Sequence, residues 1–481
     1  MRTLNGMDAA FLHAETTTMH LHVVGVLVLD PSTASGGWRP ELIEAVLASR
    51  LHLFPPFRWR LITVPGAIDR PQWIEDPDFD LPRHIHRVAL TPPGGHEQLA
   101  RFVGECASRP LDRNRPLWEL WVVEDPGDGT VALVTKLHHA IMDGGGGISL
   151  MASLLDLGPE AQPAAGGPET WWWPDRRPST MGLLTGALGR SAVRMADAPL
   201  NLVRAGRSFG GLLRTRWAQP ASLKPPRFGP RIPSGGALTA ARSVALARCS
   251  FDDVRLAKAA FETTVNDVVL AATSSAMRAY LQKLDALPRG PLKAAVPVSV
   301  RSDGPSFGNH TSVMMVALPT HVEDPVERLR CIHDQAVAAK AAHSAMGTEL
   351  VEHTLAVVPL PLINGLTGAL SGLRLARVIP PVINIVVSNV AGPRTPLYCA
   401  GARVVAVYPM GPLIEGAGLN LTVLSQDNDL DVGVMACPDL MGEPDVIASG
   451  FADGLSELVA AIPDSRHAPA RPAAGVATDR G

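Results

Sequence analysis

The first 157 residues alternate between strand-like and helix-like hydrophobic patterns. Residues 21–30 (LHVVGVLVLD) are typical of a strand, and residues 41–51 (ELIEAVLASRL) are typical of an amphipathic helix. Residues 130–140 (TVALVTKLHHA) are apolar on both faces, as in a strand buried in the middle of a sheet. After a run of glycines, apolar residues return at helical spacing, so this segment predicts a strand, a tight turn and a helix.

A second α/β unit is predicted from about Leu238 to Pro463. It contains the strand patterns ARSVALARCS, LKAAVPVSVR and INIVVSNV, and Thr264 could cap the helix that begins VNDVVLAATSSAMRAYL. The stretch GLNLTVLSQDNDLDVGVMA predicts two strands joined by an Asp-Asn-Asp turn. We therefore expect domains at residues 1–157 and 237–463, followed by a disordered tail at 464–481.

Residues 158–236 form a linker rich in proline, glycine and arginine. Within it, Met181–Trp217 is expected to form two short amphipathic helices separated at Pro199. The only acidic residue in this stretch is Asp197. Its arginines are Arg190, Arg194, Arg204, Arg207, Arg214 and Arg216. Such helices either lie on an anionic membrane or pack across the two domains with their arginines solvated. The adjacent Trp171–Trp173 has no role that its sequence context defines.

Composition points to a cytoplasmic protein that does not bind nucleic acid. The 481 residues carry a formal net charge of −3, which gives no overall attraction to polyanions. Five widely separated cysteines outside CxxC pairs indicate reduced thiols rather than disulfides or a thiolate metal site. The N-terminal residues lack the apolar core of a signal peptide.

One uncharged segment, Thr354–Leu373, has roughly the length of a membrane span. It contains Pro359, Pro361 and three glycines, which make it a poor continuous helix. We expect a buried segment or one that touches a membrane from the side.

The stretch KLHHAIMDGGGGISLM holds the candidate chemistry. For a metal site, His138 and His139 would have to share an ion, but adjacent side chains on a strand point to opposite faces. HExxH and nearby cysteine ligands are also lacking. For a phosphate cradle, the glycines precede a helix, yet neither a Gly-Lys-Ser/Thr ending nor a GxGxxG pattern accompanies them. Gly144 and its neighbours could still allow a long, thin substrate close to the backbone.

The third interpretation of this stretch is proton transfer. A neutral imidazole can take a proton from an alcohol that attacks an acyl donor. GxSxG occurs at residues 206–210 and 304–308, but neither match lies between a predicted strand and a predicted helix, as a nucleophile elbow does. A nucleophilic cysteine motif is also lacking, so direct transfer fits better than a covalent intermediate.

The segment from His138 to Gly144 resembles the HHxxxDG motif of the CoA-dependent acyltransferase superfamily. The segment PLDRNRPLWELW resembles the PLW region of the bacterial wax ester synthase/acyl-CoA:diacylglycerol acyltransferases, one branch of that superfamily. Further segments agree in order along nearly the whole chain: MDAAFLHAET, TVNDVVLAA, VPVSVR with GNH, and NIVVSNVAGP. Ala391 stands where that branch often has proline, which affects a turn more than the reaction.

The resemblance implies roles for individual residues. His139 would be the general base, His138 would support it, and Asp143 would be structural with Arg301 as its partner. Asn266 and Asp267 would begin a helix near the active site, where Asn266 either binds substrate or an oxyanion or only caps the helix. Three residues would be architecture or tunnel wall: Pro116, Leu117 and Trp118.

The resemblance also implies the fold and the reaction. The fold would be α/β, with two pseudo-symmetric domains like chloramphenicol acetyltransferase, mixed sheets and an active-site tunnel between them. A fatty acyl group would pass from acyl-CoA to diacylglycerol or a long-chain alcohol without a metal or cofactor, at a membrane surface or lipid droplet. The alternatives are another hydroxyl acceptor, such as a sterol, polyketide or glycolipid, and a non-catalytic lipid-droplet or membrane-binding protein.

Overall fold

The computed structural model describes most of the two predicted α/β units. The described residues are 1–65, 69–125, 127–141, 147, 150, 154–160, 174–193, 203, 206, 228–299, 311–346 and 360–463. Asp143, Gly144, Arg301 and Trp171–Trp173 lie outside them, as does the tail at 464–481. Of the arginines in the predicted linker helices, only Arg190 is described; Arg194, Arg204, Arg207, Arg214 and Arg216 are not.

Six strands form the N-terminal sheet, in which only the β5–β6 pair is parallel. In spatial order they are β12 (Tyr398–Cys399), β13 (Ala402–Met410), β2 (His22–Asp30), β7 (Val131–His138), β6 (Trp118–Glu124) and β5 (Ile85–Ala89). The predicted central strand is confirmed, because β7 lies between β2 and β6. Each of its residues except Thr135 is buried, as an apolar pattern on both faces requires.

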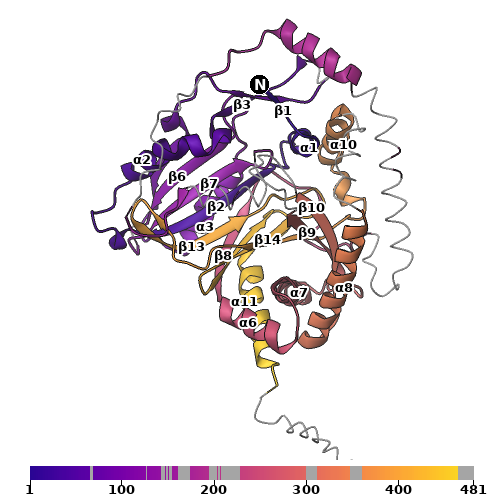
Figure 1. The fold of residues 1–481 in the computed structure, drawn as a ribbon. Helices are drawn as coiled ribbons and strands as arrows, with labels where there is room; N and C mark the ends of the chain where they lie inside the picture. Colours follow the sequence, from indigo (N-terminus) through magenta and orange to yellow (C-terminus); the bar gives the residue numbers. More distant parts are fainter. Residues whose placement is uncertain are drawn as a thin grey trace, which may run out of the picture.

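Helices and a small sheet surround this N-terminal sheet (Figure 1). The helices are α1 (Gly6–Ala14), α2 (Glu41–Arg50) and α3 (His96–Ala107). The small antiparallel sheet has the order β1 (Arg2–Thr3), β4 (Gln72–Glu75), β3 (Trp59–Ile62). The predicted helix over residues 41–51 is thus confirmed as α2.

A second six-stranded sheet forms the C-terminal unit. Its order is β10 (Thr311–Leu318), β9 (Leu292–Ser299), β11 (Ile385–Ala391), β14 (Leu419–Gln426), β15 (Asp429–Ala436) and β8 (Ser243–Ser250). Parallel and antiparallel pairs occur together, which confirms the expected mixed sheets. The predicted hairpin is also confirmed, with Asp427 in the left-handed conformation at its turn.

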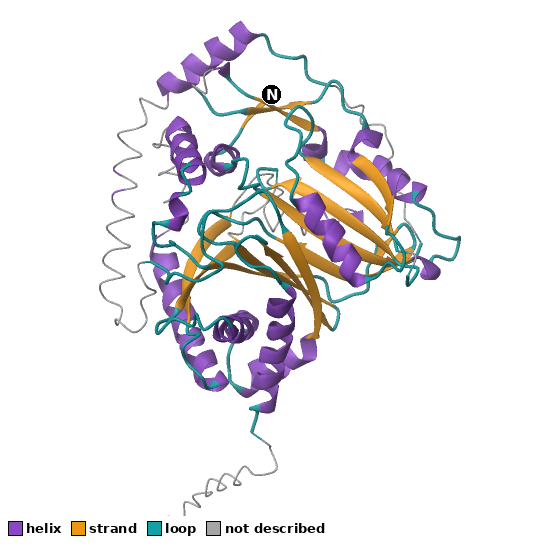
Figure 2. Ribbon diagram, turned by 180° about the vertical axis from the view of Figure 1, so that it is seen from behind, coloured by secondary structure: helices purple, strands orange, loops and turns teal. Residues whose placement is uncertain are grey.

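Four helices pack beneath the curved C-terminal sheet, as both views show (Figures 1 and 2). They are α6 (Phe251–Ala260), α7 (Val265–Lys283), α8 (Pro325–Met346) and α11 (Asp445–Ala460). Thr264 caps α7 as predicted. A Cβ at Gly454 would lie 2.5 Å from Cβ of Ser275, so α11 approaches α7 this closely only because the residue is glycine.

The C-terminal half of the chain contributes two strands to the N-terminal sheet. After β11 the chain leaves the C-terminal sheet, adds β12 and β13 to the edge of the N-terminal sheet, and returns as β14. Seven residues of β13 pair with β2, with a bulge at Val405. The predicted domain boundaries remain predictions, and the topology adds that the C-terminal half lends two strands to the N-terminal sheet.

The first described part of the linker is attached to the N-terminal unit. Residues 180–193 are helical, and Leu183 and Ala187 are buried. Nε of Arg190 lies 2.6 Å from the buried carboxylate of Asp69. For this helix, packing on the protein is therefore favoured over the alternative of membrane contact, because its Arg190 pairs with a buried acid.

The uncharged segment forms one helix over its described residues, α10 (Leu360–Gly372). Thr354–Pro359 lie outside the described residues. Pro361 falls in the first turn, where a missing backbone N–H costs the helix little. Within the described chain, every helix is too short or too polar to cross a bilayer.

Candidate active site

The two histidines stand at the end of the central strand. The backbone N–H of His138 donates to the carbonyl of Leu117 in the segment leading into β6 at 3.0 Å, and that of His139 donates to Leu21 beside β2 at 2.8 Å. Adjacent residues of a strand present their side chains to opposite faces. The His138 side chain is 1% exposed, whereas His139 is half-buried, so only His139 is accessible to a substrate.

Hydrogen bonding fixes the His138 ring. Its Nδ1 accepts the backbone N–H of Ala140 at 3.0 Å, so the neutral ring carries its proton on Nε2. That Nε2 lies 3.6 Å from the carboxylate of Glu15, which is an electrostatic contact longer than a hydrogen bond. The carbonyl of His138 also accepts the N–H of Ile141 at 2.9 Å. His138 therefore holds the turn that leaves the strand, and its support of His139 in catalysis remains a prediction.

Glu15 links His138 to Arg113. Nε of Arg113 donates to Oε2 of Glu15 at 3.1 Å, and Nη2 contacts the same oxygen while donating to the carbonyl of Leu12 at 3.0 Å. Burial opposes ionisation of Glu15, but interactions with His138 and Arg113 outweigh it and lower the pKa of Glu15 to about 2. Glu15 is thus a carboxylate at neutral pH.

Sequence reasoning missed Glu15 as a site residue. It lies within MDAAFLHAET, a segment used only for the family resemblance. The available signal was an acid at the end of a helix just before the first strand of the sheet, which carries no specificity on its own.

The accessible ring of His139 rests on α1. It stacks on Phe11, with ring centroids 4.3 Å apart and planes inclined by 23°. This contact fixes the plane of the half-buried ring. Asp143, Gly144 and Arg301 lie outside the described residues, so the predicted Asp143–Arg301 pair remains a prediction.

The PLW segment supports the histidine strand. Pro116, Leu117 and Trp118 are buried, and the Leu117 carbonyl is the acceptor for the His138 N–H. The Trp118 indole donates to the carbonyl of Phe57 at 2.8 Å, and its ring stacks between Phe57 and His84, each with centroids at 4.5 Å. These contacts tie the segment to β7, Phe57 and His84, and its role as architecture or tunnel wall of the active site remains a prediction.

Asn266 and Asp267 stand at the first turn of α7. Oδ2 of Asp267 accepts the N–H of Thr264 at 3.0 Å and Nδ1 of His333 on α8 at 2.8 Å. Asp267 is 1% exposed, so these contacts favour helix capping and helix–helix attachment for it. Asn266 is half-buried beside it. A substrate contact by either residue remains a prediction.

Buried polar groups fill the face of the sheet on the His138 side. Nζ of Lys136 is paired with Glu119 at 2.8 Å and donates to the carbonyls of Cys106 and Arg109. His22, opposite His138 in the register, has its pKa held well below the ordinary value by burial and then by Lys136. Among the described residues, no cluster of three His, Cys, Asp or Glu side chains could hold a metal ion.

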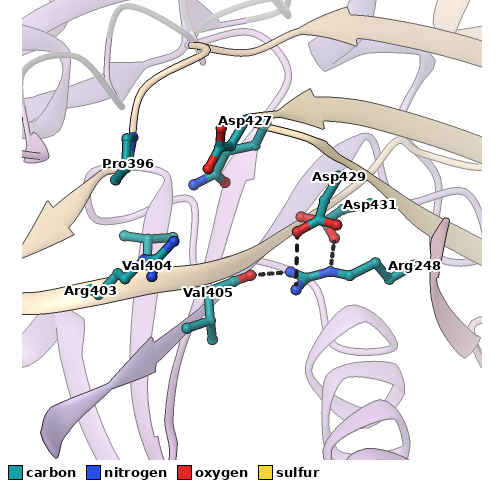
Figure 3. Close-up of a pocket in the computed structure, with 9 residues that line it drawn as sticks. Arg248, Pro396, Arg403, Val404, Val405, Asp427, Asp429 and Asp431 are labelled. Carbon is teal, nitrogen blue, oxygen red and sulfur yellow. Dashed lines mark hydrogen bonds and ion pairs between the residues drawn. The ribbon is translucent and has the colours of Figure 1, made fainter. Parts of the chain in front are cut away.

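A polar cavity of about 200 Å³ lies apart from the histidines, between β8, β13 and the β14–β15 hairpin (Figure 3). Nε of Arg248 lies 2.8 Å from Asp431, whose other oxygen accepts the N–H of Val407 at 2.7 Å. Charged groups dominate the lining, so the cavity does not suit an acyl chain.

Known proteins resemble the chain over nearly its full length. A model of the wax ester synthase/diacylglycerol acyltransferase catalytic domain matches residues 4–269, and one of the C-terminal domain of that family matches residues 307–459. A Mycobacterium tuberculosis protein provisionally named a diacylglycerol O-acyltransferase is 36% identical, covering 95% of this chain and 90% of its own length. A second such M. tuberculosis protein is 34% identical, covering 96% and 98%.

Solved structures agree with these relatives. The wax ester synthase/diacylglycerol acyltransferase of Marinobacter aquaeolei superposes with a TM-score of 0.66 at 27% identity, covering 95% of this chain and 98% of that one. The first condensation domain of the calcium-dependent antibiotic synthetase shares the fold, with a TM-score of 0.58 at 16% identity over 96% and 97% of the two chains. The chain is therefore an acyltransferase that belongs to the wax ester synthase/diacylglycerol acyltransferase family.

Proposed function

We propose that His139 is the general base in the transfer of a fatty acyl group from acyl-CoA to the hydroxyl of diacylglycerol. The observation that carries this proposal is the difference between the two histidines of the motif. His138 is buried with Nδ1 engaged by the backbone, whereas His139 is half-buried and supported by Phe11. A general base needs an accessible ring in a fixed orientation.

In this mechanism His139 takes the proton of the acceptor hydroxyl as the oxygen attacks the thioester carbonyl carbon. Collapse of the tetrahedral intermediate breaks the C–S bond, and the proton passes to the departing CoA thiolate. Asn266 is the proposed donor to the oxyanion. The reaction needs no metal or cofactor, because acyl-CoA is a substrate and its thioester supplies the activated acyl group.

Direct transfer is also favoured by three of the five cysteines, because a thiol must ionise to act as a nucleophile. Burial raises the pKa of Cys106 and of Cys399 to about 12, and that of Cys249 to about 11. These thiols stay protonated at neutral pH and are unsuited to forming an acyl-enzyme intermediate.

Diacylglycerol is the preferred acceptor in this proposal because relatives that are 34–36% identical carry its name. Long-chain alcohols are the second acceptor class, because the family model and the Marinobacter relative are named for wax ester synthesis as well. A sterol, polyketide or glycolipid acceptor, and a non-catalytic lipid-droplet protein, are the competing hypotheses.

The test is CoA release from palmitoyl-CoA, with diacylglycerol and hexadecanol offered separately. H139A should lower the rate by on the order of a hundredfold or more. H321A is the matched control, because His321 is an exposed histidine beyond β10 and its loss should leave the rate unchanged. Undiminished turnover in H139A would assign the base to another residue, and no turnover with either acceptor would favour another acceptor class or a non-catalytic role.

We also propose that the protein works at the cytoplasmic face of a membrane or on a lipid droplet. Diacylglycerol partitions into bilayers, so an enzyme that uses it must reach that surface. Peripheral attachment needs an exposed apolar face and basic residues rather than a spanning helix.

A further inference from the structure

The outer face of α10 and the turn after it form an exposed apolar surface, called here the α10 surface. Its apolar residues are between 44% and 70% exposed, and they are Leu362, Leu366, Leu373, Val378, Ile379 and Val382. Single exposed apolar residues are ordinary, but a contiguous group of this kind marks a contact with another apolar body.

Leucines lie on the solvent-facing side of α10, whereas two hydroxyl residues lie on its inner side beside the half-buried Ile363 and Leu370. Leu362, Leu366 and Leu373 recur at helical spacing on its outer face. On its inner face, the Thr367 hydroxyl reaches the carbonyl of His13 at 3.4 Å, and the Ser371 hydroxyl donates to Glu415 at 2.8 Å. A helix made for contact with water would bury its leucines and expose its hydroxyls. The solvent-facing side of α10 is therefore suited to a non-aqueous surrounding.

The charged residues that follow α10 in the sequence are basic up to Glu415, whose carboxylate lies on the inner side of the helix at Ser371. Arg374 and Arg377 follow α10 directly and are exposed. The sequence contains no aspartate or glutamate between Glu352 and Glu415. Guanidinium groups form bidentate hydrogen bonds with phosphates, and basic residues beside an apolar face are attracted to anionic lipids.

We infer that the α10 surface docks on an anionic phospholipid bilayer, with its leucines in the acyl region and its two arginines at the phosphates. This inference rests on the proposed function, because an acceptor dissolved in a bilayer gives the contact its purpose. Beyond membrane association itself, the inference names the surface of the protein that makes the contact and the charge of the lipid headgroups that this surface binds.

The position of α10 connects this surface to the catalytic histidine. Its inner face packs on α1, and the two helices lie side by side in both views (Figures 1 and 2). Phe11 of α1 is the ring on which His139 stacks. Ile363 of α10 packs against the hydrophobic core of the N-terminal unit. Docking therefore brings the bilayer within two helix layers of the reacting group, a short path for an apolar acceptor.

The test is flotation of the full-length protein with vesicles of phosphatidylcholine alone or with 30% phosphatidylglycerol. We expect binding to the anionic vesicles, at least tenfold weaker binding for L362S/L366S/L373S, and a similar loss for R374E/R377E. L256S/V337S is the matched control, because both residues are more than half exposed on C-terminal helices, and it should bind like the wild type.

CoA release from a short-chain acyl-CoA to a water-soluble alcohol separates this inference from the proposed function. Both α10 variants should keep the wild-type rate there and lose at least tenfold with diacylglycerol in anionic vesicles. A wild-type protein that does not float, or variants that float unchanged, would overturn the docking surface whatever the rate with soluble substrates. A wild-type dimer that becomes monomeric in the leucine variant would reassign the surface to self-association. Failure of the proposed function alone would appear as no CoA release from a protein that still floats.

Discussion

Replacing Glu15 by glutamine removes the negative charge that faces His138 and pairs with Arg113. The side chain of Glu15 is only 11% exposed, so solvent screens it little. Its pKa falls from the ordinary value of 4.5 to about 2 in the folded protein. A difference of that size corresponds to about 3 kcal/mol of stability at neutral pH. We therefore expect E15Q to lower the free energy of unfolding at pH 7 by about 2 to 3 kcal/mol.

The pH dependence of this loss follows from the direction of the pKa change. Because the folded pKa is lower than the unfolded one, the carboxylate stabilises the fold fully above about pH 4.5. The contribution is lost as the pH falls towards 2, where both states bind the proton. The difference between wild type and E15Q should therefore be about 1 kcal/mol smaller at pH 3.5 than at pH 7.

Urea unfolding of both proteins at the two pH values measures the effect. E97Q is the matched control, because Glu97 also pairs with an arginine, Arg101, but is 90% exposed. It should unfold like the wild type at both pH values, since exposed ion pairs contribute little. Equal stability of E15Q and wild type at pH 7, or a gap that does not change with pH, would refute the role assigned to the carboxylate.

Two further substitutions test the supports of the site. W118F removes the hydrogen bond to Phe57 and part of a stacked ring, and should cost about 2 kcal/mol of stability in urea unfolding. An unfolding midpoint equal to that of the wild type would show that the Trp118 indole does not contribute to the stability of the fold. D267A should also cost about 2 kcal/mol, by loss of the helix cap and the bond to His333, while kcat/KM for CoA release changes less than tenfold. A hundredfold fall in kcat/KM at unchanged stability would instead make Asp267 a substrate contact.

Local patterns predicted much of this fold. The run of apolar residues before His138 identified a central strand because a strand buried on both faces has no polar side. Thr264 was recognisable as a cap because its hydroxyl and Asp267 have capping-box spacing. The opposite orientation expected for His138 and His139 follows from strand geometry alone, and their unequal burial agrees with it.

Features that depend on distant parts of the chain were not predictable. Glu15 and His138 meet only after α1 folds against β7, and no local pattern records that contact. Strand β13 reads as an ordinary member of the C-terminal unit, although it pairs with β2. In α10, hydropathy alone gives an apolar helix. The orientation of the helix depends on hydrogen bonds of Thr367 and Ser371 to His13 and Glu415, which are distant in the sequence.

The exchange of β13 into the N-terminal sheet sets an order for synthesis and folding. Strand β2 ends at Asp30 and its partner β13 begins at Ala402, about 370 residues later. At ribosomal speeds of roughly 5 to 20 residues per second, β2 therefore waits some 20 to 75 seconds with one edge unpaired. An open strand edge is a template for pairing with other chains. Made as separate polypeptides, the N-terminal half would lack two strands of its sheet, and the C-terminal half would carry a β12–β13 hairpin with no sheet to join.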